Sequence, residues 1–168
     1  MRTFLKFLEN ISEWTGRVGV WMLCVVTGIV VYEVVTRRVF DSPHVWTYEV
    51  ITLFYGIHFM ILASYTLLYK SHVSIDLVYL RFSPKKRAIL DVITYLIFFF
   101  PFVIILFQGG WSLASASWAT HERTLTARLP LVMPLMKTSI AASAFLLLLQ
   151  GFVNFYRRLF FLIKGEEL

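Results

Sequence analysis

Four runs of apolar residues, each about twenty residues long, constrain what this chain of 168 residues can fold into. At about 1.5 Å of rise per residue, a helix of roughly 20 residues crosses a hydrocarbon core of about 30 Å. Backbone N–H and C=O groups must be paired in lipid, and the runs lack the alternation of barrel strands. The sequence therefore predicts an all-α integral membrane protein with four transmembrane helices, at about residues 18–36, 46–69, 88–111 and 135–155.

The composition agrees with a membrane environment. Hydrophobic residues make up 58% of the chain, whereas soluble proteins contain roughly 45–50%. The single cysteine, Cys24, lies in the first apolar run, which excludes an internal disulfide and a thiolate metal cage. We therefore interpret residues 1–168 as one membrane domain.

The segment before the first run has the pattern of an amphipathic helix. Leu5, Leu8 and Ile11 recur at helical spacing, and the charged residues fall elsewhere on the wheel. This pattern predicts an N-terminal helix that lies in the membrane interface. The run at 18–36 is longer than a signal-peptide core of about 7–15 residues and has no A-x-A cleavage site, so we interpret it as a span.

The basic residues predict the orientation. The net charge is +6, but the cations cluster at the ends of the apolar runs, which favours membrane orientation over nucleic-acid binding. Eleven fall on one side of the membrane: Arg2, Lys6, Arg17, Lys70, Arg81, Lys85, Lys86, Arg87, Arg157, Arg158 and Lys164. The other side has five: Arg37, Arg38, Arg123, Arg128 and Lys137. Both termini are therefore predicted to be cytoplasmic, with the loops at 37–46 and 112–134 outside.

The third span begins with its own signals. Ser83 and Pro84 are suited to the N-cap and the first position of a helix. The next three residues are cations, although the helix macrodipole disfavours positive charge there. Anionic phospholipid headgroups are the predicted compensation for these three residues, which are Lys85, Lys86 and Arg87.

Two further features of the third span concern its shape and packing. Pro101 removes one backbone hydrogen bond, which predicts a kink. The stretch GGWSLASASWAT that follows is rich in small residues, which let membrane helices approach closely. We therefore expect this stretch to be a packing face.

Glu33, near the outer end of the first span, admits two interpretations. In small four-span multidrug exporters a first-helix carboxylate binds substrate and proton, so this chain has the alternative of being a self-sufficient proton-coupled exporter. The simpler interpretation is an ion pair with Arg37, one turn later, which we favour.

His58 is the ionisable residue nearest the centre of a span. With His72 it forms H-x13-H, a spacing used for haem ligands in cytochrome b bundles, but the other two histidines lie outside the spans. We therefore favour a neutral His58 that is hydrogen-bonded across a helix contact. The sequence contains no nucleophile–base pair, phosphate-binding loop or metal-ligand cluster, which argues against an enzyme.

Polar residues gather at both membrane edges of the second span. Trp46 and Glu49 share a helix face at its outer end, where Glu49 is placed to neutralise Arg37 or Arg38. His72 and Asp76 form a similar polar face on the cytoplasmic side. These residues suit either interface anchoring or contact with another protein.

The same residues carry a resemblance to a known family. RRVFDSPHVWTYEV followed by KSHVSIDLV resembles the small, DctQ-type membrane subunit of tripartite ATP-independent periplasmic (TRAP) transporters. Both have an Arg before the first outer loop, Trp-x-x-Glu opening the second span, and then a His and an Asp. HERTLTARLPLVMPLMKTSI is similar to that family's third loop and fourth-span start. Size and topology match over nearly the whole chain.

The resemblance implies a role in a bacterial inner membrane. In that family a large M-type subunit holds the substrate and sodium sites and moves as an elevator for the symport of organic acids. The small subunit braces its static scaffold and helps dock a periplasmic, P-type substrate-binding protein. No cofactor is then expected on this chain. Carried over by position, the scaffold or subunit-contact residues are Arg37, Arg38, Trp46, Glu49, His72 and Asp76.

Overall fold

The computed structural model describes residues 2–69 and 82–165. These residues form α1 (Arg2–Val39), α2 (Val45–Leu68), α4 (Pro84–Thr94), the π-helical turn η1 (Tyr95–Phe99), α5 (Phe100–Ala119) and α6 (Val132–Lys164), with no strand in this part of the chain. Four stretches are long and apolar enough to cross a membrane: Leu5–Val39, Val45–Leu68, Pro84–Ala119 and Val132–Lys164. The described residues confirm the prediction of a helical fold with four helices long and apolar enough to cross a membrane.

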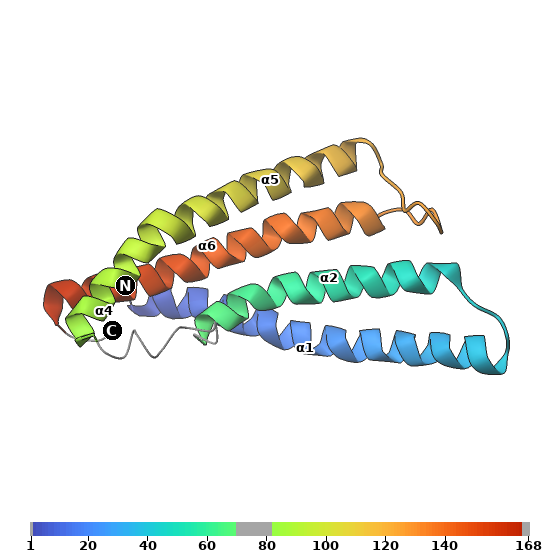
Figure 1. The fold of residues 1–168 in the computed structure, drawn as a ribbon, viewed down its shortest axis with the longest axis horizontal. Coiled ribbons are helices and arrows are strands. Elements are labelled where there is room, and N and C mark those ends of the chain that lie inside the picture. Colours follow the sequence, from blue (N-terminus) through green and yellow to red (C-terminus); the bar gives the residue numbers. More distant parts are fainter. Residues whose placement is uncertain (1, 70–81, 166–168) are drawn as a thin grey trace.

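The helices form two hairpins that pack side by side. α1 pairs with α2, α5 pairs with α6, and α6 also contacts α1, α2 and α4. Figure 1 shows the turn between α1 and α2 and the loop between α5 and α6 at one end of the bundle, and the start of α1 and the end of α6 near the other. We call these the loop end and the terminal end.

The N-terminal segment is not a helix of its own. α1 runs without interruption from Arg2 to Val39, so the amphipathic segment and the first span are one helix. Leu5 and Leu8 are buried in a cluster with Val153 of α6, and Ile11 packs against it. The apolar face therefore packs on the protein itself. No proline interrupts this stretch, so the backbone hydrogen bonding of the helix continues.

The predicted distortion at Pro101 takes the form of a π-helical turn. η1 ends two residues before this proline, and the Phe100 N–H donates to the Tyr95 carbonyl, five residues back. Pro101 lacks an N–H and its ring crowds the carbonyl four residues earlier, so a wider turn accommodates both defects. The helix bends there (Figure 1). The Phe99 ring lies over Gly151 of α6, where an added Cβ would be 2.1 Å from it.

The small residues of α5 form the predicted packing face. Gly110, Ala114 and Ser117 are buried. A Cβ placed on Gly110 would lie 3.0 Å from the backbone nitrogen of Ala141 in α6. The two helix backbones therefore meet at this glycine, as expected for small residues between membrane helices.

His58 joins α2 to α1. Its Nδ1 lies 2.7 Å from the Gly19 carbonyl oxygen, which confirms the predicted hydrogen bond across a helix contact. One turn earlier in α1, a Cβ on Gly16 would meet the Tyr65 ring at 2.1 Å, so this glycine also allows close approach. His72, the other half of the H-x13-H pair, lies outside the described residues.

Candidate functional site

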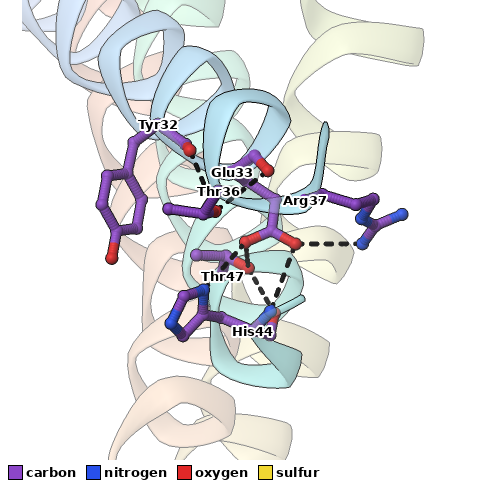
Figure 2. Close-up of polar contacts among 6 residues, drawn as sticks. All are labelled: Tyr32, Glu33, Thr36, Arg37, His44 and Thr47. Atoms are coloured by element: carbon purple, nitrogen blue, oxygen red, sulfur yellow. Dashed lines mark hydrogen bonds and ion pairs between the residues drawn. The ribbon is translucent and has the colours of Figure 1, made fainter. Parts of the chain in front are cut away.

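The loop end carries two buried carboxylates, and the first of them closes the α1–α2 turn. Glu33 is 9% exposed. It accepts hydrogen bonds from Arg37 Nη2 at 3.0 Å, from Thr47 Oγ1 at 2.8 Å and from the His44 backbone N–H at 3.3 Å. Figure 2 shows these groups converging on the carboxylate. The predicted Glu33–Arg37 pair is confirmed.

Glu33 also serves the start of the next helix. α2 begins at Val45 with His44 as its N-cap, and no side chain of the cap residue satisfies the first turn. The first N–H groups of a helix have no intrahelical acceptor and carry partial positive charge. A carboxylate from α1 supplies both an acceptor and negative charge at that point. Glu33 therefore ties the end of α1 to the start of α2.

An aromatic cluster covers this contact on one side. The His44 ring lies 5.8 Å from Tyr32 and 6.0 Å from Trp46, measured between ring centroids. His44 Nδ1 is 3.6 Å from Glu33 Oε2. Trp46 is 40% exposed, so its anchoring role at the interface stays a prediction.

Glu49, the second buried carboxylate, corrects the sequence interpretation. It was predicted to neutralise Arg37 or Arg38, but it binds the loop between α5 and α6. It accepts hydrogen bonds from Thr124 Oγ1 at 2.5 Å, from the Ala127 N–H at 2.9 Å and from the Thr126 N–H at 3.3 Å. These donors surround the buried carboxylate, while Arg37 is occupied by Glu33 and Arg38 is exposed.

The loop that Glu49 holds contains a closed turn. The Thr124 N–H donates to the Leu129 carbonyl at 3.4 Å, and the Leu129 N–H donates to Thr124 Oγ1 at 2.8 Å. We call residues 124–129 the outer turn. Arg128 adopts a left-handed conformation within it, with φ of 51°. Thr124 therefore closes the turn and ties it to α2 at the same time.

A third carboxylate secures the start of this loop. Glu122 accepts a hydrogen bond from Ser117 Oγ at 2.7 Å and another from Lys137 Nζ. It joins the end of α5 to the beginning of α6. The Lys137 hydrogen bond, together with the one from Ser117, lowers the pKa of Glu122 from its ordinary value of 4.5, and partial burial opposes this only in part.

This lowered pKa predicts that Glu122 makes a pH-dependent contribution to the stability of the fold, which the substitution Glu122→Gln removes. A carboxyl whose pKa is lower in the folded state stabilises the fold above its ordinary pKa, and that stabilisation is lost as pH falls through the lowered value. We expect the melting temperature of the wild type to exceed that of Glu122→Gln at pH 7. The difference shrinks as pH falls below 4.5. Thermal unfolding in detergent across this range tests it, and a difference that stays constant down to acidic pH would contradict it.

The terminal end is held by ion pairs between helices. Arg157 lies 2.8 Å from Glu9 of α1, and Arg158 lies 2.9 Å from Asp91 of α4, each measured from nitrogen to carboxylate oxygen. Asn154 Nδ2 donates to the Tyr95 hydroxyl and to the Leu67 carbonyl, both at 3.3 Å. The C-terminal half of α6 therefore holds α1, α2 and α4 together.

The predicted lipid-binding residues lie at the start of α4. Ser83 is its N-cap and Pro84 lies in the first turn, as predicted, although the Ser83 side chain makes no cap hydrogen bond. Lys85 and Lys86 are exposed. Arg87 Nε donates to the Phe82 carbonyl at 2.8 Å. The binding of anionic headgroups stays a prediction.

The structure does not bring all the predicted site residues together. Arg37, Arg38, Trp46 and Glu49 lie at the loop end, whereas His72 and Asp76 fall outside the described residues. Sequence reasoning missed Thr47 and Thr124, the hydroxyl donors to Glu33 and Glu49. The place of Thr47 at the third position of α2 was a weak sequence signal for such a role. Nothing in the sequence around Thr124 indicated that its hydroxyl would bind Glu49. Within the described residues, no group of three His, Cys, Asp or Glu side chains is arranged to hold a metal ion.

The fold and the site define a class of protein: a four-span helical membrane protein whose buried carboxylates hold its own loops in place. A family model described as the DctQ component of tripartite ATP-independent periplasmic transporters matches residues 26–161. The chain belongs to this family, so it is the small membrane subunit of a TRAP transporter. The predicted family is confirmed.

A curated relative is also similar to this chain. It is the sialic acid TRAP transporter permease protein SiaT of Haemophilus influenzae (strain 86-028NP), 24% identical over 138 residues. The match covers 79% of this chain and 22% of SiaT. The chain therefore spans about a fifth of the length of that relative.

Proposed function

We propose that this chain is a static brace in a sodium-driven TRAP transporter. It supports the scaffold of a large M-type elevator subunit and helps dock a periplasmic substrate-binding protein for the uptake of organic acids. One observation carries the proposal: the buried carboxylates at the loop end are fully used in holding the chain's own loops. Glu33 and Glu49 each accept three hydrogen bonds from within the chain. Such groups maintain a fixed surface.

The relative supports a division of labour between this chain and a larger partner. A segment like this chain corresponds to 22% of the length of SiaT, so most of that permease lies outside the matched part. We place the substrate and sodium sites on the large subunit and no cofactor on this chain. Arg37, Arg38, Trp46 and Glu49 are then scaffold or subunit-contact residues, and His72 and Asp76 are proposed to act in the same way.

The proposed setting is the bacterial inner membrane, with both termini in the cytoplasm and the loop end in the periplasm. The excess of Lys and Arg at the terminal end supports this orientation. α1 has 38 residues, which at about 1.5 Å each exceeds a hydrocarbon core of about 30 Å by roughly 27 Å. Its first turns are therefore proposed to lie at the level of the cytoplasmic headgroups, where Lys85, Lys86 and Arg87 bind anionic phospholipid.

Co-purification tests the proposal. We expect this chain to co-purify with a large M-type membrane subunit, and uptake to require both chains and the binding protein. Liposomes that contain this chain alone are expected to take up nothing. Glu33→Gln should at most weaken assembly, because glutamine keeps an acceptor for Thr47 or His44. Proton-coupled efflux by this chain alone, abolished in Glu33→Gln, would instead establish the exporter alternative.

A further inference from the structure

The outer turn presents an apolar side chain to its surroundings. Leu125 is 93% exposed, more than any other large hydrophobic residue in the described part of the chain. Thr126 and Arg128 beside it are also exposed. A side chain this exposed gains little from packing within the fold, so Leu125 is available for contact with another molecule.

The outer turn is held in place by hydrogen bonds to α2 and by hydrogen bonds within the turn itself. Glu49 binds Thr124, Thr126 and Ala127, which flank or adjoin the leucine. Thr124 also closes the base of the turn through its bonds with Leu129. A connection between two antiparallel helices does not need this anchoring to a third helix. A loop that is already held in one conformation loses little conformational entropy when it binds, so the anchoring favours recognition of a partner of fixed shape.

The charge around Leu125 is positive. Arg123 and Arg128 are both exposed on either side of it. The nearest carboxylates along the chain and across the contact, Glu122 and Glu49, are occupied with Lys137 and with the turn itself. Figure 1 shows the loop between α5 and α6 leaning toward the start of α2 at the loop end. The apolar tip is therefore flanked along the chain by two exposed cations.

We infer that the outer turn inserts Leu125 into an apolar pocket with an acidic rim on the periplasmic substrate-binding protein. An apolar centre within a polar, charge-complementary rim is the usual arrangement of a protein interface. A protein partner suits this turn better than lipid does. Fluid acyl chains have no fixed shape, so binding to them would not require three hydrogen bonds to hold the turn in one conformation. The inference rests on the proposed function, since it requires the loop end to face the binding protein.

Binding of the soluble protein to the complex of this chain with its large subunit, held in nanodiscs, tests the inference. Leu125→Asn is expected to weaken binding about tenfold or more, since an apolar anchor is lost. Leu125→Glu should weaken it further, because a carboxylate would face an acidic rim. Ile163→Asn is the matched control: Ile163 is 74% exposed at the opposite end of the bundle, and binding should not change.

The flanking cations give a second readout. Arg123→Gln and Arg128→Asn should slow association and reduce its dependence on salt concentration. Asparagine is chosen at Arg128 because it tolerates the left-handed conformation. Amide hydrogen exchange at Thr126 and Ala127 shows whether the turn stays formed in each variant.

Three results would overturn the inference. In the first, the Leu125→Asn variant binds the soluble protein as tightly as the wild type does. In the second, the variant no longer binds the large subunit. In the third, the effect of the substitution on binding changes with the anionic lipid content of the nanodisc. The last two assign the turn to the membrane subunit or to lipid. Failure of the wild-type chain to associate with the large subunit is a different result, because it contradicts the proposed function itself.

Discussion

Replacing Gly110 by leucine is expected to destabilise the bundle, whereas the same change at Gly109 is expected to leave it intact. A Cβ on Gly110 would lie 3.0 Å from the backbone nitrogen and 3.2 Å from the Cα of Ala141. Backbone atoms cannot move aside as a side-chain end can, so α5 and α6 must separate. Overpacking of this kind costs about 1–3 kcal/mol.

Gly109 provides the matched control because it is the adjacent residue in the same helix. A Cβ there meets nothing within 4 Å. Replacing glycine in a helix by leucine improves helix propensity by roughly 0.5–1 kcal/mol, so Gly109→Leu should be neutral or slightly stabilising. Unfolding by sodium dodecyl sulfate from a mild detergent, followed by circular dichroism, measures both variants. Equal stability of the two variants would show that α5 and α6 do not meet at Gly110.

Glu49→Leu is expected to release the loop between α5 and α6 from α2. Leucine fills a similar space but removes the acceptor for two backbone N–H groups and for the Thr124 hydroxyl. Buried donors without an acceptor are unfavourable, so the outer turn should leave α2 and become hydrated. Amide exchange at Thr126 and Ala127 should then accelerate about tenfold or more, since local opening becomes easier.

Glu49→Gln separates hydrogen bonding from charge. Both backbone N–H groups bind Oε1, and glutamine retains one acceptor oxygen for them. Its amide N–H groups can donate to the Thr124 hydroxyl, which accepts as well as donates. We therefore expect exchange in Glu49→Gln to fall between that of the wild type and that of Glu49→Leu.

Glu13→Leu is the control for this series. Glu13 forms an exposed ion pair with Arg17 on α1, away from the loop end that carries Glu49. It should leave exchange at Thr126 and Ala127 unchanged. If Glu49→Gln accelerates exchange as much as Glu49→Leu does, the negative charge rather than the acceptor geometry holds the loop.

Local patterns predicted much of this structure because they depend on neighbours in the chain. Glu33 and Arg37 are one helical turn apart, so their pairing follows from helix geometry alone. Pro101 lies mid-way along an apolar run and lacks the N–H that an interior helix position needs, so the sequence predicted a distortion there, and only its form as a π-helical turn was new. The burial of Gly110, Ala114 and Ser117 likewise follows from small size within an apolar run.

The sequence by itself determined the number of spans, the helical class and the family pattern, because apolar length and residue order are local properties. The tertiary structure decided which donors meet Glu49, since Thr124 lies 75 positions later and comes near only when α6, paired with α5, packs beside α2. It also decided that Leu5 and Leu8 pack against α6. A carboxylate or an apolar face takes the partner that packing brings within reach, and packing depends on the whole chain.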